Sequence, residues 1–313
     1  MDFVTGFPFS LRLSCTKRKG ELFLKKETVI ETFEEQKMSV AKYQLTSDLF
    51  AGKVFEDLEA AQELCRILMQ NDRIILRSVR TQYVIQNLEN HSVVLDIFAE
   101  EQQGNLIDIE IQMYREKAPF KRSRYYQSSI DMSILEKGKP YHTLPDVTII
   151  YLTKEDFIGE RKGFYNIDRK SGGQEVTMCL ENGFHEKYYN LEYPVDDMRI
   201  NELLHYFQHS EPFYKTENFP RIVERVSYLK TKKEGVALMC EITDRIRREG
   251  REEGRIIGKV EDILELLEEL GKIPQWIATR IGQETDPEQL RKWHKCAAKA
   301  SDMAEFEALF SRL

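Results

Sequence analysis

The segment that most constrains the fold is a pair of strand-like runs joined by a short polar loop, VVLDIFAEEQQGNLIDIEIQMYREK, residues 93–117. In its second run, aliphatic residues alternate with polar ones: Ile107, Ile109, Ile111 and Met113 against Asp108, Glu110 and Gln112. Successive side chains of a strand point to opposite faces, so one face is aliphatic and the other acidic. Carboxylates in such a strand are costly to desolvate unless a cation or solvent neutralises them. The pattern predicts either a metal site or an ordinary exposed sheet face.

The length of the loop sets the register of this hairpin. An odd loop, residues 101–105, pairs Asp96 with Glu110 and places both carboxylates side by side on one face. An even loop would separate them unless Gly104 forms a bulge. Two adjacent carboxylates suit Mg²⁺, which keeps several waters and can activate one against a phosphate. The odd register therefore predicts a magnesium site.

A predicted helix follows the hairpin, APFKRSRYYQSSIDMSIL, residues 118–135, and enters through Pro119, a residue favoured in the first turn. Its first turns carry our candidate DNA-binding residues: Lys121, Arg122, Arg124 and Tyr126. Basic and aromatic side chains directly after an acidic hairpin can hold a phosphate backbone near the metal. The alternative is a solvated helix face whose tyrosines pack on the sheet.

The order of these residues resembles a known family. Asp96, then Glu110-x-Gln112, then the Arg-x-Arg-Tyr-Tyr stretch at 122–126 is similar to the recombination-promoting nuclease or putative transposase family, within the PD-(D/E)XK nuclease superfamily. The resemblance continues upstream, through residues 45–55 and a predicted helix at 58–68, and downstream through residues 137–152. It covers roughly residues 38–270.

The resemblance implies an α/β (α+β), restriction-endonuclease-like core, in which helices flank a mixed sheet, and metal-dependent cleavage of DNA. Asp96 and Glu110 would then bind Mg²⁺ or another divalent cation. Gln112 would occupy the position at which the superfamily pattern has a lysine. A neutral amide can orient groups by hydrogen bonds but cannot supply the charge of a lysine. Gln112 therefore puts the rate and the mechanism of cleavage in question.

A third acidic ligand is also implied, because members of the superfamily often add a glutamate from the first helix. Glu63, in the stretch AAQELCRIL, is the closest match to that residue. Glu56 and Glu59 compete for the same role.

Charge and composition narrow the function further. The 313 residues carry a formal net charge of −7, which is unfavourable for general nucleic-acid affinity. Any DNA contact must therefore be local and weakened by salt. No apolar run reaches about 18 residues, so we expect no membrane span. The five cysteines are scattered without a CxxC pair, which argues against a zinc ribbon and favours reduced thiols in a cytoplasmic protein.

The chain is predicted to have four parts. Residues 1–37 are expected to be a poorly ordered extension, with Met38 suspected as the natural start. Residues 38–230 would form the nuclease-like domain, residues 231–270 a long charged helical linker, and residues 271–313 a small helical module.

β-strand signals follow the core strand expected at residues 148–152. FYNID, the turn RKSGG, EVTMCL and KYYNLEY predict a hairpin and a further strand that closes the sheet edge. Residues 196–209 then predict a helix, in which His205 and His209 are four apart. No HExxH pattern accompanies them, so surface or helix-packing histidines are the favoured interpretation over a metal pair.

The C-terminal region is helical in pattern. Gly250, Gly254 and Gly258 recur every four residues, a spacing that either admits a second helix, as in a homo-oligomer, or marks a flexible charged hinge. Asp286-Pro287 predicts a helix start. The expected packing residues of the last module are Trp276, Trp293, Phe306 and Phe310.

Two functions stay open on these grounds. One is a metal-dependent DNA endonuclease connected with mobile elements or recombination. The other is a nuclease-fold binding or regulatory protein with little or no cleavage, which acts through its C-terminal helices. A protease or other hydrolase finds no support, because no GxSxG elbow and no paired Cys and His motif stand out.

Overall fold

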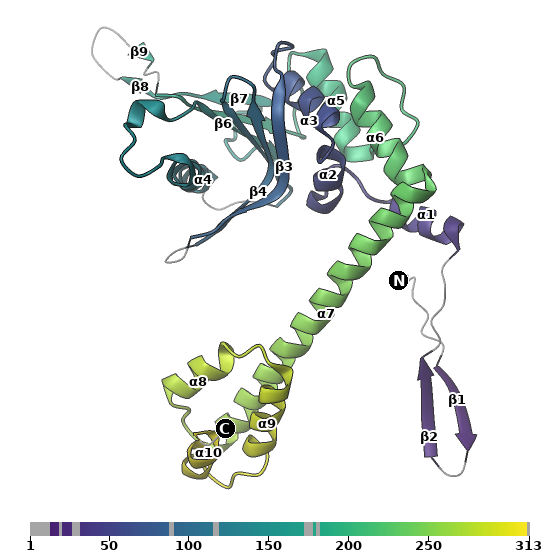
Figure 1. Ribbon diagram of the computed structural model, residues 1–313, viewed down its shortest axis with the longest axis vertical. Coiled ribbons are helices and arrows are strands. Elements are labelled where there is room, and N and C mark those ends of the chain that lie inside the picture. Colours follow the sequence, from purple (N-terminus) through teal and green to yellow (C-terminus); the bar gives the residue numbers. More distant parts are fainter. Residues whose placement is uncertain are drawn as a thin grey trace. The chain divides into compact units, whose positions relative to one another are not determined.

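The computed structural model describes residues 13–18, 21–26, 32–87, 91–114, 119–171, 178–179 and 182–311. The chain divides into two compact units, Met1–Ala237 and Leu238–Leu313. The first is built around a six-stranded sheet (Figure 1). Its strands, in spatial order, are β3 (Leu76–Ile85), β4 (Val93–Glu101), β5 (Leu106–Gln112), β6 (Val147–Thr153), β10 (Phe184–Asn190) and β7 (Phe164–Ile167).

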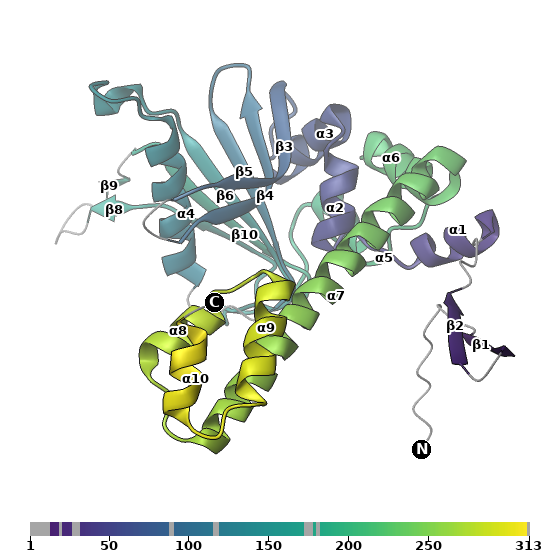
Figure 2. The ribbon, with the colours of Figure 1, turned by 60° about the horizontal axis from the view of Figure 1, so that its bottom comes forward.

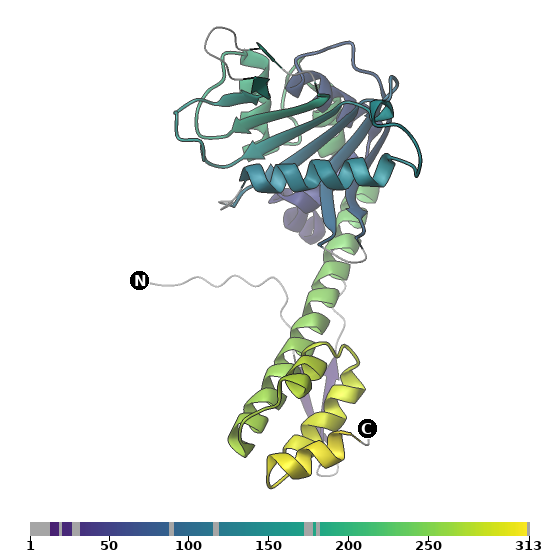
Figure 3. The same ribbon diagram turned by 90° about the vertical axis from the view of Figure 1, so that its left-hand side faces the viewer.

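The sheet is mixed. β5, β6 and β10 run parallel to one another, whereas β3 and β4 at one side and β7 at the other pair antiparallel to their neighbours. Two adjacent parallel strands need a long crossover connection. Helix α4 (Pro119–Ile134) lies within that connection between β5 and β6, and it crosses one face of the sheet (Figure 3).

Four helices lie on the opposite face, as Figure 2 shows: α2 (Asp48–Phe55), α3 (Leu58–Leu68), α5 (Met198–His209) and α6 (Pro220–Thr231). The Tyr189 hydroxyl of β10 donates a hydrogen bond to the Leu68 carbonyl at the end of α3, at 2.6 Å. Phe55 of α2 stacks on Phe207 of α5 with ring centroids 5.9 Å apart. The sheet is therefore the middle of three layers, which agrees with the predicted α/β architecture.

The alternation predicted for the second strand of the hairpin is confirmed, and both of its faces are buried. Only Gln112, at its end, is partly exposed. Asp108 and Glu110 are 0% and 1% exposed, which excludes the alternative of a solvated polar face. Helix α4 covers them with Tyr126 and Ile130, which belong to the same buried cluster as Tyr151 of β6.

Most predicted elements are confirmed: the helix at 58–68 is α3, the helix at 118–135 is α4, the strand at 148–152 lies in β6, and the helix at 196–209 is α5. The prediction that the last strand closes the sheet is wrong. β10 lies inside the sheet, between β6 and β7, and the earlier strand β7 forms the edge. Strand β3, which forms the other edge, was not predicted from the sequence.

The N-terminal region holds secondary structure within the predicted extension. β1 (Leu13–Arg18) and β2 (Glu21–Lys26) pair antiparallel, and α1 (Phe33–Ala41) follows. Thr32 and Glu35 form a capping box at the start of α1. The domain boundary expected at Met38 therefore falls inside a helix. The remaining residues of that extension lie outside the described part of the chain, as do residues 172 and 173 of the turn expected at 169–173. Residues 170 and 171 of that expected turn form the short strand β8 (Lys170–Ser171).

The second unit contains α8 (Gln275–Gly282), α9 (Pro287–Ala297) and α10 (Met303–Phe310), with most of α7 (Lys233–Leu270). Trp293, Phe306 and Phe310 are buried in its core, as predicted, whereas Trp276 is 50% exposed. The predicted helix start at Asp286 is confirmed, because its carboxylate accepts the Glu288 amide at 2.9 Å. Three further short elements lie in the first unit: β8 (Lys170–Ser171), β9 (Met178–Cys179) and the 3-10 helix η1 (Tyr141–Thr143). No helix in the described residues is both long and apolar enough to cross a membrane.

Two glycines of α7 should respond oppositely to the same change. A Cβ atom on Gly235 would lie 2.3 Å from the Tyr228 carbonyl oxygen, so Gly235→Ala must displace backbone and should cost about 2 kcal/mol or more of unfolding free energy. A Cβ atom on Gly250 meets nothing within 4 Å, so Gly250→Ala should gain up to about 1 kcal/mol of helix propensity. Urea denaturation of both variants measures this. Equal effects would contradict the tight approach at Gly235.

Candidate active site

β4 and β5 separate at the two acidic residues singled out in the sequence. Their pairing runs from Glu100 opposite Leu106 to Ile97 opposite Ile109, so the structure has the odd one of the two registers considered. Beyond that point β5 stays paired with β6, and β4 stays paired with β3. Asp96 and Glu110 are the next residues on the two diverging strands.

Each of these carboxylates accepts a hydrogen bond from the backbone of the other strand. Glu110 Oε1 lies 3.0 Å from the Asp96 amide nitrogen, and Asp96 Oδ2 lies 2.8 Å from that of Ile111. Buried backbone N–H groups need a partner, and here side chains supply it where the β4–β5 ladder has ended. These two hydrogen bonds hold the carboxylates together at the point where β4 and β5 begin to separate.

Strand β3 contributes a residue that was not predicted from the sequence. Gln82 donates from Nε2 to Asp96 Oδ1 at 3.1 Å. Its backbone has φ of 50°, a left-handed conformation that is uncommon for a residue other than glycine. The β-branched and aromatic residues in the stretch 76–85 could have indicated the strand, but no local signal singles out Gln82.

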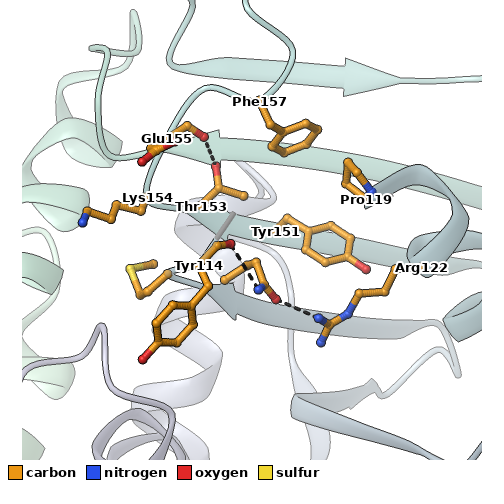
Figure 4. A pocket seen from close by; sticks show the side chains of 10 residues that line it. Tyr114, Pro119, Arg122, Tyr151, Thr153, Lys154, Glu155 and Phe157 are labelled. Atoms are coloured by element: carbon orange, nitrogen blue, oxygen red, sulfur yellow. Dashed lines mark hydrogen bonds between the residues drawn. The ribbon is translucent and has the colours of Figure 1, made fainter. Parts of the chain in front are cut away.

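Arg122 of α4 joins the acidic pair to its neighbours. Its Nη2 atom donates to Glu110 Oε2 at 3.3 Å and to the Tyr126 hydroxyl at 2.8 Å, and its Nη1 atom donates to Gln112 Oε1 at 2.9 Å. The guanidinium also lies 5.0 Å from the centre of the Tyr126 ring. Gln112 in turn donates to the Tyr114 carbonyl at 3.3 Å. Figure 4 shows Tyr114 and Arg122 on two sides of this group of hydrogen bonds.

The four predicted DNA-binding residues therefore have different positions. Lys121 and Arg124 are exposed on α4. Arg122 points inward, and Tyr126 is 9% exposed. Tyr126 thus follows the alternative of a tyrosine packed on the sheet.

The site holds more acid than base. Burial is the main cause of the raised pKa of Asp96, which is about 6, and the nearby charge of Asp48 raises this pKa further. Burial also raises the pKa of Glu110 and of Asp108 well above the usual range, and the neighbouring carboxyls reinforce both shifts. Arg122 opposes all three shifts. A bound cation would relieve this repulsion, because a nearby positive charge favours the ionised carboxylate.

A depression of about 470 Å³ opens beside this cluster. Asp48 at the start of α2 lines it together with Asp96, Gln112 and Arg122. Burial raises the pKa of Asp48 as well. Asp48 was not among the candidates selected from the sequence, although Ser47-Asp48 is the type of pair that marks a helix start.

The glutamates predicted as a third ligand are engaged elsewhere. Glu63 accepts the Ile222 amide at 2.9 Å, at the beginning of α6. Glu59 pairs with Arg221 at 3.2 Å, and Glu56 pairs with Lys53. Asp48 is the acidic residue outside the hairpin that the structure brings to Asp96.

The donor atoms at the strand divergence are those that a magnesium ion uses. Mg²⁺ is commonly held by one or two carboxylates together with waters and substrate phosphates. Asp96 and Glu110 supply two, and both buried oxygens of Asp108 have no hydrogen-bond partner among the described residues. Among the described residues, no group of three or more His, Cys, Asp or Glu side chains could hold a metal. The residues therefore fit an ion that is bound by two carboxylates together with waters and substrate. They do not fit an ion that is surrounded by protein ligands alone.

The two histidines of α5 are both exposed, which agrees with the interpretation as surface histidines. The rings of His205 and His209 stack with centroids 4.2 Å apart. His209 Nδ1 lies 2.9 Å from the His205 carbonyl oxygen.

A mixed sheet flanked by helices, with paired acids where two strands diverge, defines a restriction-endonuclease-like α/β fold. A family model described as PD-(D/E)XK nuclease family transposase matches residues 64–170, from α3 to the start of β8. Residues 64–170 are thus similar to a PD-(D/E)XK nuclease family transposase domain, and the matched segment includes Asp96, Glu110, Gln112 and Arg122. No curated protein and no solved structure matched the chain.

Proposed function

We propose that this protein is an endonuclease that hydrolyses phosphodiester bonds of DNA with a divalent cation, Mg²⁺ or a similar ion, held by Asp96 and Glu110. The observation that carries the proposal is the reciprocal hydrogen bonding of these carboxylates at the strand divergence. It holds the buried Glu110 carboxylate together with that of Asp96, and Asp96 lines a depression that can admit a phosphate. The transposase-domain match supports the same class of reaction.

The residues around the pair have separate roles in this proposal. When bound, the cation would polarise the phosphate and lower the pKa of an attacking water. Gln112 is held by Arg122 and by the Tyr114 carbonyl, so its amide is fixed beside the reacting group. Lys121 and Arg124, exposed on α4, would contact the phosphate backbone, so binding should weaken steeply with salt. A cytoplasmic location and self-association through the C-terminal helices stay predictions.

A cleavage assay tests the proposal. Wild type should cut plasmid DNA with Mg²⁺, and Asp96→Ala and Glu110→Ala should each cut on the order of 10³-fold more slowly or not at all. Asp72→Ala is a matched control, because Asp72 is an exposed carboxylate whose partner is Arg199 at 2.8 Å. Wild type that cuts no DNA with any divalent metal, or alanine variants that cut as fast as the control, would refute the proposal.

A second function is favoured by one observation. In this structure both oxygens of Glu110 already have protein partners, the Asp96 amide and the Arg122 guanidinium. Such a site can be stable without a metal, as in a nuclease-fold binding or regulatory protein that acts through its C-terminal helices. DNA binding without cleavage, unchanged by Mg²⁺, would identify this alternative.

A further inference from the structure

We propose that Arg122 is a catalytic residue of this site, whose guanidinium supplies from α4 the positive charge that the neutral Gln112 does not supply from the strand. The inference rests on the proposed nuclease function and deepens it. It also reassigns Arg122 from general DNA binding to the reacting phosphate.

The position of the guanidinium supports this role. Nη1 lies 2.9 Å from Gln112 Oε1, at the tip of that side chain. A lysine at position 112 would carry its ammonium group into the same space. Nη2 lies 3.3 Å from Glu110 Oε2, so the charge is also beside a carboxylate that would hold the cation.

The guanidinium is held in place before substrate arrives. The Tyr126 hydroxyl accepts from Nη2 at 2.8 Å, and the Tyr126 ring packs beneath the group. The Arg122 side chain is still 31% exposed, and it lines the depression that contains Asp48 and Asp96. A planar guanidinium can donate two parallel hydrogen bonds to a phosphate, and a fixed donor costs little reorganisation during the reaction.

The reaction that Arg122 would assist consumes one water. The water oxygen forms a bond to phosphorus, and the bond between phosphorus and one ester oxygen breaks. One proton of the water ends on the released hydroxyl, and the other passes to solvent. Negative charge develops on the phosphate oxygens along this path, and Arg122 would stabilise it there.

The ion pair with Glu110 makes the role separable from a structural one. Arg122 competes with a divalent cation for the Glu110 carboxylate, because like charges beside one carboxylate repel. Removal of the guanidinium should therefore strengthen metal binding and slow cleavage. Loss of a residue with only a structural role would instead weaken metal binding and slow cleavage together.

The test compares Arg122→Met with Arg77→Met. Arg77 is a matched control, because it is an exposed arginine paired with Glu100 at 3.1 Å on the same sheet. By calorimetric titration, Arg122→Met should bind Mn²⁺ about fivefold more tightly than wild type. With Mg²⁺ and plasmid DNA its kcat should fall about 100-fold with little change in KM. The control should match wild type in both measurements.

Two further variants cover the case in which Arg122→Met folds poorly by circular dichroism. Arg122→Lys keeps the charge and should keep more than a tenth of the wild-type rate, and Gln112→Lys added to Arg122→Met should recover at least about tenfold. Cleavage by Arg122→Met at the wild-type rate, or weaker Mn²⁺ binding in a folded variant, would overturn the inference. If wild type itself cuts no DNA, the proposed function fails, whereas the Mn²⁺ titration still decides whether Arg122 competes for Glu110.

Discussion

Asp96→Asn should lower the DNA cleavage rate by on the order of 10³-fold and leave a folded protein that is more stable than wild type near neutral pH. The asparagine oxygen can still accept the Ile111 amide, the bond that Asp96 Oδ2 makes at 2.8 Å. Its amide nitrogen can donate to Gln82 once that side chain turns its oxygen inward. The fold at the strand divergence therefore survives, while one of the two anionic donors is lost.

The gain in stability follows from the pKa of Asp96. Burial raises that pKa from 3.8 to about 6 in the folded protein. Between about pH 4 and about pH 6 the folded state therefore binds more protons than the unfolded chain, so the free energy of unfolding falls as the pH rises. The loss amounts to about 2–3 kcal/mol for this group and is complete above the folded-state pKa. Asparagine does not titrate and avoids that loss.

Urea denaturation at pH 4.5 and pH 7.5, beside the cleavage assay, measures both effects. Asp96→Asn should lose less stability between the two values than wild type does. Asp72→Asn serves as the control, because Arg199 holds the pKa of Asp72 below its ordinary value and no such gain is expected. An asparagine variant that still cuts DNA at the wild-type rate would remove Asp96 from the site.

Asp108→Leu should raise the free energy of unfolding by about 1–3 kcal/mol at pH 7, which is unusual for a change at a fully buried position. Asp108 is 0% exposed, and neither of its carboxyl oxygens has a hydrogen-bond partner in the described part of the chain. Its neighbours on the adjacent strands are Phe98 and Ile149. Leucine is close in size and leaves no polar group without a partner.

The gain should grow with pH. Burial and the Asp96 charge raise the pKa of Asp108 well above its usual range. Wild type therefore loses stability as the pH rises above the unfolded-state value of about 3.9, up to the raised folded-state value. Leucine removes this dependence, so the difference between variant and wild type should be larger at pH 8 than at pH 5 in urea denaturation.

Asp131→Leu provides a comparison for this substitution. Asp131 is a partly buried acid of α4 that accepts a hydrogen bond from Gln127 at 3.1 Å, so it should gain nothing from leucine. If Asp108→Leu instead lowers stability and abolishes binding of Mn²⁺, Asp108 has a ligand role and its unpartnered oxygens face the cation.

The strand pair and the helix behind it could be predicted from the amino-acid sequence, whereas the register of the pair stayed open between an odd and an even loop. Alternation at residues 106–112 specifies which side chains share a face, and the two possible loop lengths specify two registers, of which the structure has the odd one, with Asp96 opposite Glu110. These are local properties, because they depend on residues close together in the chain. The order of the motifs along the chain was also enough to indicate the family.

The other groups that meet these two acids could not be predicted in this way, because tertiary packing selects them. Asp48 and Gln82 reach Asp96 from separate elements, α2 and β3, whereas Glu63 is used at the start of α6. Arg122 points into the site because α4 packs across the acidic face and buries it. No sequence period encodes such contacts, since they depend on how elements distant in the chain pack against one sheet.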